Sequence, residues 1–175
     1  DHDEISGVKA ARQAATALGM RFVAGVEISV TWANETVHVV VLQVDENNPA
    51  LIAGLAATRN GREKRAREMA AQLEQAGIPT PYEGALRYVA NPDLMSRTHF
   101  ARYLCEIGVC TTTSDVFRRF LTEGKPGYVP HRWATLGEAM GWIQGAGGIA
   151  VIAHPGRYRF SDTAQGALFD EFRQL

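Results

Sequence analysis

The stretch GVEISVTWANETVHVVVLQV, residues 25–44, decides the fold of this chain. Two runs rich in Val, Ile and aromatic residues are typical of β-strands, and the pair Ala33-Asn34 separates them. This pattern predicts a β-hairpin, in which a two-residue loop would pair Trp32 with Glu35. The loop sets the register of the two strands, so it also decides which side chains share a face.

Two polar residues of the hairpin are expected on the same face. In this register Ser29 faces His38 and Glu27 faces Val40, so Glu27 and His38 are diagonal neighbours that can close onto a shared ion. A slip of one residue would put them on opposite faces. The alternative is a solvated Glu27 and an outward-facing His38. Both interrupt mostly apolar runs, however, where a charged group is costly without a partner.

Strand and helix signals alternate at both ends of the chain, and helical spacing fills the middle. The pattern predicts an α/β protein with a helical insertion. The expected parts are residues 1–48 and 133–175, which carry the strands, and residues 49–132, which form the insertion and carry one candidate ligand.

The composition excludes some classes of protein. The chain has 175 residues, of which 46% are hydrophobic, and a formal net charge of -1. It can therefore bury a core, and it has no global attraction to nucleic acid or to membranes. No apolar run reaches the roughly 20 residues that span a bilayer. Cys105 and Cys110 match neither a redox motif nor a zinc motif, so reduced thiols and a cytoplasmic protein are expected.

A histidine at the end of a predicted strand is a further candidate ligand. In AVIAHPGR, residues 150–157, four apolar residues precede His154, and Pro155-Gly156 ends the strand. A histidine at such a junction is more often a hydrogen-bonded structural residue. Its functional interpretation therefore depends on companions elsewhere in the chain.

Two more histidines complete the set. His2 lies between two carboxylates in DHD, where a neighbouring Asp can orient a ligand imidazole through its second nitrogen. His99 follows Ser96, a candidate N-cap of a helix. Each alone is more often structural. With the three candidates above they make four histidines and one carboxylate, a nitrogen and oxygen donor set that suits Mn, Fe or Zn.

The order of these motifs resembles the PHP (polymerase and histidinol phosphatase) phosphoesterases. The segments that carry the resemblance are DHD, GVEISV, a histidine in the next strand, RTHFAR and IAHPGR. They are similar to the bacterial branch of nucleoside 3',5'-bisphosphate phosphatases and RNA 5'-end exonucleases. The resemblance implies part of a distorted (β/α)7 TIM-like barrel with a helical insertion and a site for three divalent ions, Mn first and Fe or Zn as alternatives. The implied ligands are His2, Glu27, His38, His99 and His154, and the glutamate bridges two ions.

The chain departs from the family pattern at both ends. The first family motif, His-x-His, would lie before Asp1, and the last, Asp-x-His, would lie after Leu175. A closed barrel of this type typically has about 250 residues. We therefore expect either a fragment or a sequence that omits parts of the polypeptide, unable to close the barrel alone.

The resemblance implies a hydrolase that uses metal-activated water on phosphate esters. The expected reaction removes the 3'-phosphate of nucleoside 3',5'-bisphosphates, and the same enzyme would trim short RNA from its 5' end. The alternatives are a PHP phosphatase of another small metabolite, such as histidinol phosphate, or a non-catalytic metal or nucleic-acid binding module. The expected partner is a nucleotide or short oligonucleotide, with no membrane and no protein partner.

Positive charges near the predicted ligands are expected to contact substrate phosphate. The predicted substrate-binding residues are Arg97, Arg157, Arg102, Lys125 and His131. Arg97 and Arg157 are favoured because each lies close to a predicted ligand in the sequence. For Arg102 and Lys125 an exposed surface position is an equal alternative. For His131 a structural role is favoured over a role as an acid or phosphate donor.

The basic run RNGREKRAR, residues 59–67, suggests a nucleic-acid surface. Glu63 and Glu68 break its single-sign charge. A solvated helix face is therefore the favoured interpretation of this run.

Overall fold

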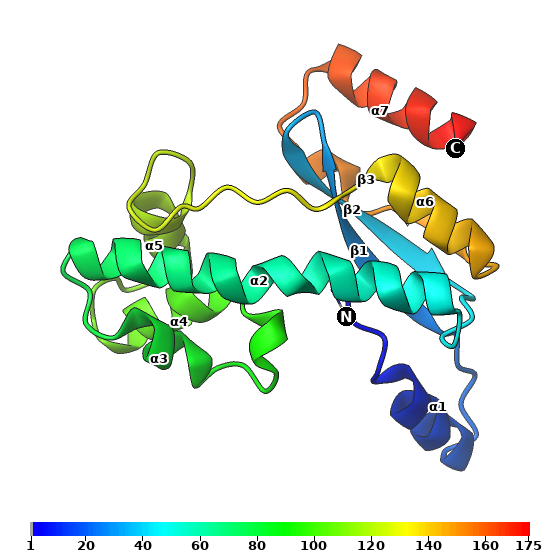
Figure 1. The fold of residues 1–175 in the computed structure, drawn as a ribbon, viewed down its shortest axis with the longest axis horizontal. Coiled ribbons are helices and arrows are strands. Elements are labelled where there is room, and N and C mark those ends of the chain that lie inside the picture. The colour runs from blue at the N-terminus through cyan, green and yellow to red at the C-terminus, as the bar shows by residue number, and fades with distance from the viewer. Residues whose placement is uncertain (1) are drawn as a thin grey trace. The chain divides into compact units, whose positions relative to one another are not determined.

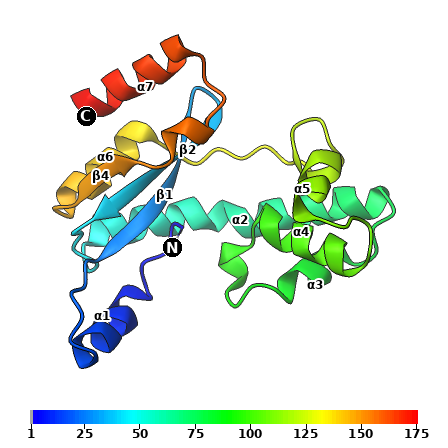
Figure 2. The same ribbon diagram turned by 180° about the vertical axis from the view of Figure 1, so that it is seen from behind.

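The computed structural model describes residues 2–175. They form two compact units (Figure 1 and Figure 2). The first unit contains the residues up to Thr58 together with Arg132–Leu175, and the second contains Arg59–His131. Within residues 2–175, no helix combines the length and the apolar character needed to cross a membrane.

The predicted hairpin is confirmed, with its register. Strand β1 (Gly25–Trp32) pairs antiparallel with β2 (Glu35–Leu42), and Trp32 lies opposite Glu35. Ala33 and Asn34 have φ angles of 47° and 66°, which is the left-handed pair of conformations that a type I′ turn requires. This turn matches the right-handed twist of the strands, and it sets every pairing behind it.

Four strands form one sheet in the order β3-β1-β2-β4. The short strand β3 (Ala134–Thr135) runs parallel to β1, and β4 (Ile149–Ile152) runs antiparallel to β2. The predicted α/β class is confirmed. The described residues form this open mixed sheet, and a four-stranded sheet does not by itself make the barrel that the resemblance implies.

Side chains alternate between the two faces of the hairpin, and one face is apolar. Its residues are Val26, Ile28, Val30, Val37, Val39 and Val41, all of which are buried. Four helices contribute to the same core: α1 (Val8–Ala17), the start of α2 (Pro49–Gln75), α6 (Leu136–Gly145) and α7 (Asp162–Gln174). Because the apolar face is covered, the opposite face presents Glu27, Ser29 and His38.

The apolar pattern alone does not predict helix α6, but the start of this helix carries a local signal. Thr135 and Glu138 form a reciprocal capping box, in which each side chain bonds the backbone N–H of the other residue. The sequence T-L-G-E fits the capping-box pattern. Helix α6 could therefore have been predicted from this signal.

The second unit is helical, as predicted. Its elements are the remainder of α2, α3 (Pro81–Leu86), the short helix η1 (Pro92–Leu94), α4 (Arg97–Glu106), α5 (Thr113–Val116) and the π-helical turn η2 (Phe117–Leu121). Met69, Leu73, Phe100, Leu104 and Leu121 are among the residues of its own buried core. The division into a barrel and an insertion at residues 49–132 stays a prediction.

The type I′ turn predicts the effect of a substitution at its first central residue. A left-handed conformation costs a non-glycine residue about 1–2 kcal/mol, whereas glycine adopts it freely but loses about 0.5–1 kcal/mol through its flexible unfolded state. We therefore expect Ala33→Gly to stabilise the protein by about 0.5–1 kcal/mol, measured by urea unfolding followed by circular dichroism. Asn34→Ala, which removes a residue that tolerates this conformation, should destabilise. A less stable Ala33→Gly variant would contradict the turn type.

Candidate metal centre

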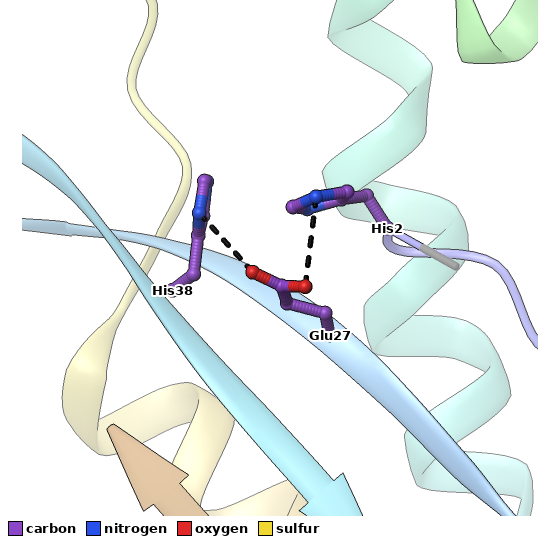
Figure 3. A group of neighbouring side chains, drawn as sticks. All are labelled: His2, Glu27 and His38. Carbon is purple, nitrogen blue, oxygen red and sulfur yellow. Dashed lines mark ion pairs between the residues drawn. The ribbon is translucent and has the colours of Figure 1, made fainter. Parts of the chain in front are cut away.

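A glutamate on β1 lies between two imidazoles (Figure 3). Glu27 Oε2 lies 3.6 Å from His2 Nε2, and Glu27 Oε1 lies 3.4 Å from His38 Nδ1. One ligand atom from each of the three residues lies within 4.8 Å of the others. The two carboxylate oxygens thus face different imidazoles, which is the geometry of a carboxylate able to bridge two ions.

A third imidazole reaches the same carboxylate from the end of β4, the strand next to β2. His154 follows β4 and precedes the short helix η3 (Pro155–Arg157). Its Nε2 lies 3.4 Å from Glu27 Oε1 and 3.3 Å from His38 Nδ1. The structure therefore brings together four of the five predicted ligands: His2, Glu27, His38 and His154.

The protonation state of His38 suits metal binding. Burial lowers the pKa of His38 to about 4, helped by the nearby His2 and His154 and opposed by the Glu27 charge. At neutral pH this imidazole is therefore uncharged and keeps a lone pair, as a ligand must. His38 Nδ1 has two close contacts, Glu27 Oε1 and His154 Nε2. A single proton can satisfy only one of them, whereas a metal cation could accept a lone pair from each of the three residues. The donor set of nitrogen and oxygen without thiolate fits Mn, Fe or Zn.

The segment that carries His2 is fixed to β1 by its neighbour Asp3. The Asp3 N–H donates to Glu27 O at 2.9 Å, and the buried Asp3 carboxylate accepts from Ser29 N at 2.7 Å and Ser29 Oγ at 2.8 Å. In the sequence, this carboxylate was a candidate to orient an imidazole. The structure instead shows both of its oxygens bonded to Ser29, so Asp3 holds the His2 backbone beside Glu27.

His99 lies in the second unit and has a local role there. Its Nδ1 accepts a hydrogen bond from the N–H of Ser96, at 3.0 Å, and thereby caps α4. Because Nδ1 is an acceptor, the neutral ring carries its proton on Nε2, which makes Nε2 a donor rather than a lone pair for a metal. Burial lowers the pKa of His99, and Arg102 and Arg62 lower it further. The role of His99 as a fifth ligand stays a prediction.

Three arginines of the second unit are largely withdrawn from solvent. Arg62 is only 8% exposed, so the expected solvated face is wrong at this position of the basic run. Arg65 Nε donates to Val129 O at 2.9 Å, and burial together with the charges of Arg97 and Arg62 lowers its pKa to about 10. Burial likewise lowers the pKa of Arg97. Like charges held this close attract an anion.

A π-helical turn holds Arg97 in place. Arg97 Nη1 donates to Leu121 O at 3.3 Å, and its guanidinium lies 5.7 Å from the centre of the Phe117 ring. Both partners belong to η2, and π-helical turns are frequent at functional sites. Contacts within the second unit therefore fix the orientation of Arg97, a predicted phosphate contact.

The other predicted substrate contacts differ in burial. Arg102, Lys125 and Arg157 are exposed, and His131 is half-buried. The His131 ring lies against Gly61 of α2, where an added Cβ would come within 2.5 Å of His131 Cε1. The roles of these four residues in substrate binding stay predictions.

Comparison with known proteins shows relatives over almost the whole chain. The chain is 51% identical over 173 residues to a 3',5'-nucleoside bisphosphate phosphatase from Chromobacterium violaceum, and 44% identical over 163 residues to the 5'-3' exoribonuclease Rnm from Salmonella typhimurium. These matches cover 99% and 92% of this chain but 61% and 55% of the relatives. The chain thus spans less than two thirds of their length. No protein-family profile matches it.

Two solved structures share the fold. A C. violaceum amidohydrolase, solved with bound sulfate and no metal, has a TM-score of 0.96 and 51% identity, over 99% of this chain and 61% of that one. A protein from Bifidobacterium adolescentis, described as a candidate metal-dependent phosphoesterase, has a TM-score of 0.84 and 29% identity, over 98% of this chain and 62% of that one.

The fold is similar to that of a candidate metal-dependent phosphoesterase, and the cluster of His2, Glu27 and His38 could hold a metal ion. Within that class, the chain is similar to the branch of nucleoside 3',5'-bisphosphate phosphatases and 5'-3' exoribonucleases. The resemblance inferred from the sequence is confirmed.

The Asp3–Ser29 contact predicts how substitutions at these two positions differ. Removing the acceptor with Asp3→Ala would leave the buried Ser29 N–H without this partner, at a cost of about 1–3 kcal/mol. Asp3→Asn keeps an acceptor oxygen and should cost less than half as much. Chemical unfolding of the metal-free protein measures both. Equal stability of Asp3→Ala and wild type would show that the contact does not hold the segment.

Proposed function

We propose that this protein is a metal-dependent phosphoesterase that removes the 3'-phosphate from nucleoside 3',5'-bisphosphates. The observation that carries the proposal is the convergence of His2, Glu27, His38 and His154 in a chain 51% identical to a phosphatase of that name. The four-stranded sheet would then belong to a distorted (β/α)7 barrel, with the ligands on its inner face.

Each proposed ligand would provide different donor atoms to the metal ions. His2, His38 and His154 would each provide one nitrogen, and Glu27 would provide both oxygens, in different directions. Three ions are proposed, with Mn first and Fe or Zn as alternatives. Divalent ions bound there would lower the pKa of water and neutralise charge on the phosphoryl oxygens. The protein supplies no nucleophile of its own in this scheme.

Recognition of phosphate is proposed to involve polar side chains from each unit. Arg97 and the Nε2 donor of His99 would bind phosphate oxygens, and the further contacts would be Arg102, Lys125 and His131 of the second unit and Arg157 of the first. Partly buried guanidinium groups bind oxyanions strongly because little water competes for them. Sulfate, a tetrahedral dianion like phosphate, is bound in the related C. violaceum structure, which supports an oxyanion-binding protein.

Removal of nucleotides from the 5' end of short RNA is a second candidate activity. The 44% identity to an exoribonuclease favours it. The chemistry is the same, because each cut attacks a phosphate ester.

The two free cysteines, Cys105 and Cys110, suit the reducing conditions of the cytoplasm, where we place the enzyme. A phosphatase for another metabolite and a non-catalytic binding module have no comparable support.

Glu27→Gln tests the bridging carboxylate. Because a bridging ligand serves two ions, we expect metal content to fall and kcat to fall by more than about 100-fold, since even residues behind the ligands are worth about 10- to 100-fold. Elemental analysis and steady-state hydrolysis of adenosine 3',5'-bisphosphate by the intact protein measure these effects. Glu35→Gln, an exposed glutamate of the same hairpin, is the matched control. Unchanged metal content and kcat in Glu27→Gln would refute the proposed centre.

His99→Gln separates a ligand from a substrate contact. We expect the metal content to stay at the wild-type level and KM for adenosine 3',5'-bisphosphate to rise about 10-fold, the worth of one hydrogen bond of about 1.5 kcal/mol to a charged group. His38→Ala provides the comparison, since it should lose metal. If His99→Gln loses metal as His38→Ala does, His99 is a ligand after all.

A further inference from the structure

Tyr158 joins the strand that carries His38 to the segment between β4 and His154. Its hydroxyl accepts a hydrogen bond from the His38 N–H at 2.9 Å and donates one to Ala153 O at 3.0 Å. Ala153 is the residue directly before His154. One phenol therefore contacts the backbone at one ligand and next to another.

The hydroxyl occupies a position inside the β-ladder. Strands β2 and β4 pair antiparallel up to Val39 opposite Ile152, so His38 and Ala153 would form the next pair. One half of that pair is present, because the Ala153 N–H donates to His38 O at 2.9 Å. In the other half, the Tyr158 hydroxyl lies between the His38 N–H and Ala153 O. The two backbones therefore separate at His38 and Ala153, and the Tyr158 hydroxyl between them sets their distance.

The ring of Tyr158 also packs against a ligand. Its centre lies 5.5 Å from that of His154, edge to face. His154 Nδ1 is buried, and no hydrogen bond reaches it from within residues 2–175. A ligand imidazole is usually oriented by a hydrogen bond to its second nitrogen. At His154 the aromatic contact takes that place.

The hydroxyl can hold both bonds at neutral pH. A phenol ordinarily has a pKa of about 10, so it keeps its proton and can donate to one backbone group while accepting from the other. The ring also packs against Phe160, at 5.6 Å between centres, which restricts its movement.

We propose that Tyr158 is a positioning residue of the metal centre, which fixes the separation of the His38 and His154 imidazoles. The hydroxyl sets the spacing of the two backbones, and the ring sets the orientation of the His154 side chain. This inference rests on the proposed function, because the spacing matters only if both imidazoles bind metal. Nothing in the local sequence pattern marks Tyr158 for this role.

The test is Co²⁺ binding by the intact, metal-free protein, followed by visible absorption. The band positions report the coordination geometry, which a general loss of stability would not move. Tyr158→Phe removes the hydroxyl and keeps the ring. We expect it to weaken Co²⁺ binding about 10- to 100-fold, as loss of a residue behind a ligand does, and to shift the bands.

Tyr103→Phe is the matched control. Tyr103 is buried in the second unit, and its hydroxyl donates to Pro79 O at 2.7 Å. Its removal costs a tyrosine-to-backbone bond of the same kind, so the melting temperature of the metal-free protein should fall in both variants. The Co²⁺ affinity and spectrum should change only in Tyr158→Phe.

Two negative results have different meanings. If the wild-type protein binds no Co²⁺, the proposed metal centre itself is wrong, whatever Tyr158 does. If the wild type binds Co²⁺ and Tyr158→Phe binds it with the same affinity and spectrum, the centre stands and the positioning role is overturned. Tyr158→Leu, which also removes the ring, should lose more affinity than Tyr158→Phe, and equal affinity would overturn the part assigned to the ring.

Discussion

Glu27 and His38 share one face of the sheet only because Trp32 pairs with Glu35 across a two-residue turn. The opposite face of the same strands is lined with buried valines and an isoleucine. A slip of one residue would expose that apolar set to water and separate the two polar side chains. The hydrophobic effect on one face therefore holds the register that the chemistry on the other face needs. The contacts of His2 and His154 with Glu27 follow from this register.

The two units contribute different kinds of polar group. In the first, burial keeps His38 uncharged, so the sheet presents nitrogen lone pairs around a single carboxylate. In the second, burial lowers the pKa of Arg65 to about 10, still far above neutral pH, so its charge remains. Imidazoles are thus used where a lone pair is needed, and guanidinium groups where charge is needed. Both are taken out of water, which strengthens their interaction with ions.

The parts of the fold that could be predicted are those with local information. The hairpin register follows from the loop and from residue alternation, and Glu27 and His38 follow from it. The start of helix α6 is also predictable from local information, because Thr135 and Glu138 form a capping box. The burial of Arg62 was not predictable, because segments distant in the sequence approach this part of α2, such as His131 against Gly61 and Val129 O at Arg65 Nε. The same holds for Tyr158, because its hydroxyl contacts His38 on β2 and Ala153 just after β4. For His99, the motif marked the residue, but only the Ser96 bond shows which nitrogen carries the proton.

The backbone at two site residues limits which side chains can evolve there. Asp3 and His154 have φ angles of 53° and 33°, a region that Asn, Asp and His enter more readily than other non-glycine residues. Position 154 can therefore exchange its imidazole for a carboxylate or an amide with little new backbone strain. Such an exchange replaces a nitrogen donor with oxygen, which harder ions such as Mg²⁺ prefer. If His154 binds metal as proposed, a single substitution at this position would change the metal preference, while a β-branched residue there would be strained.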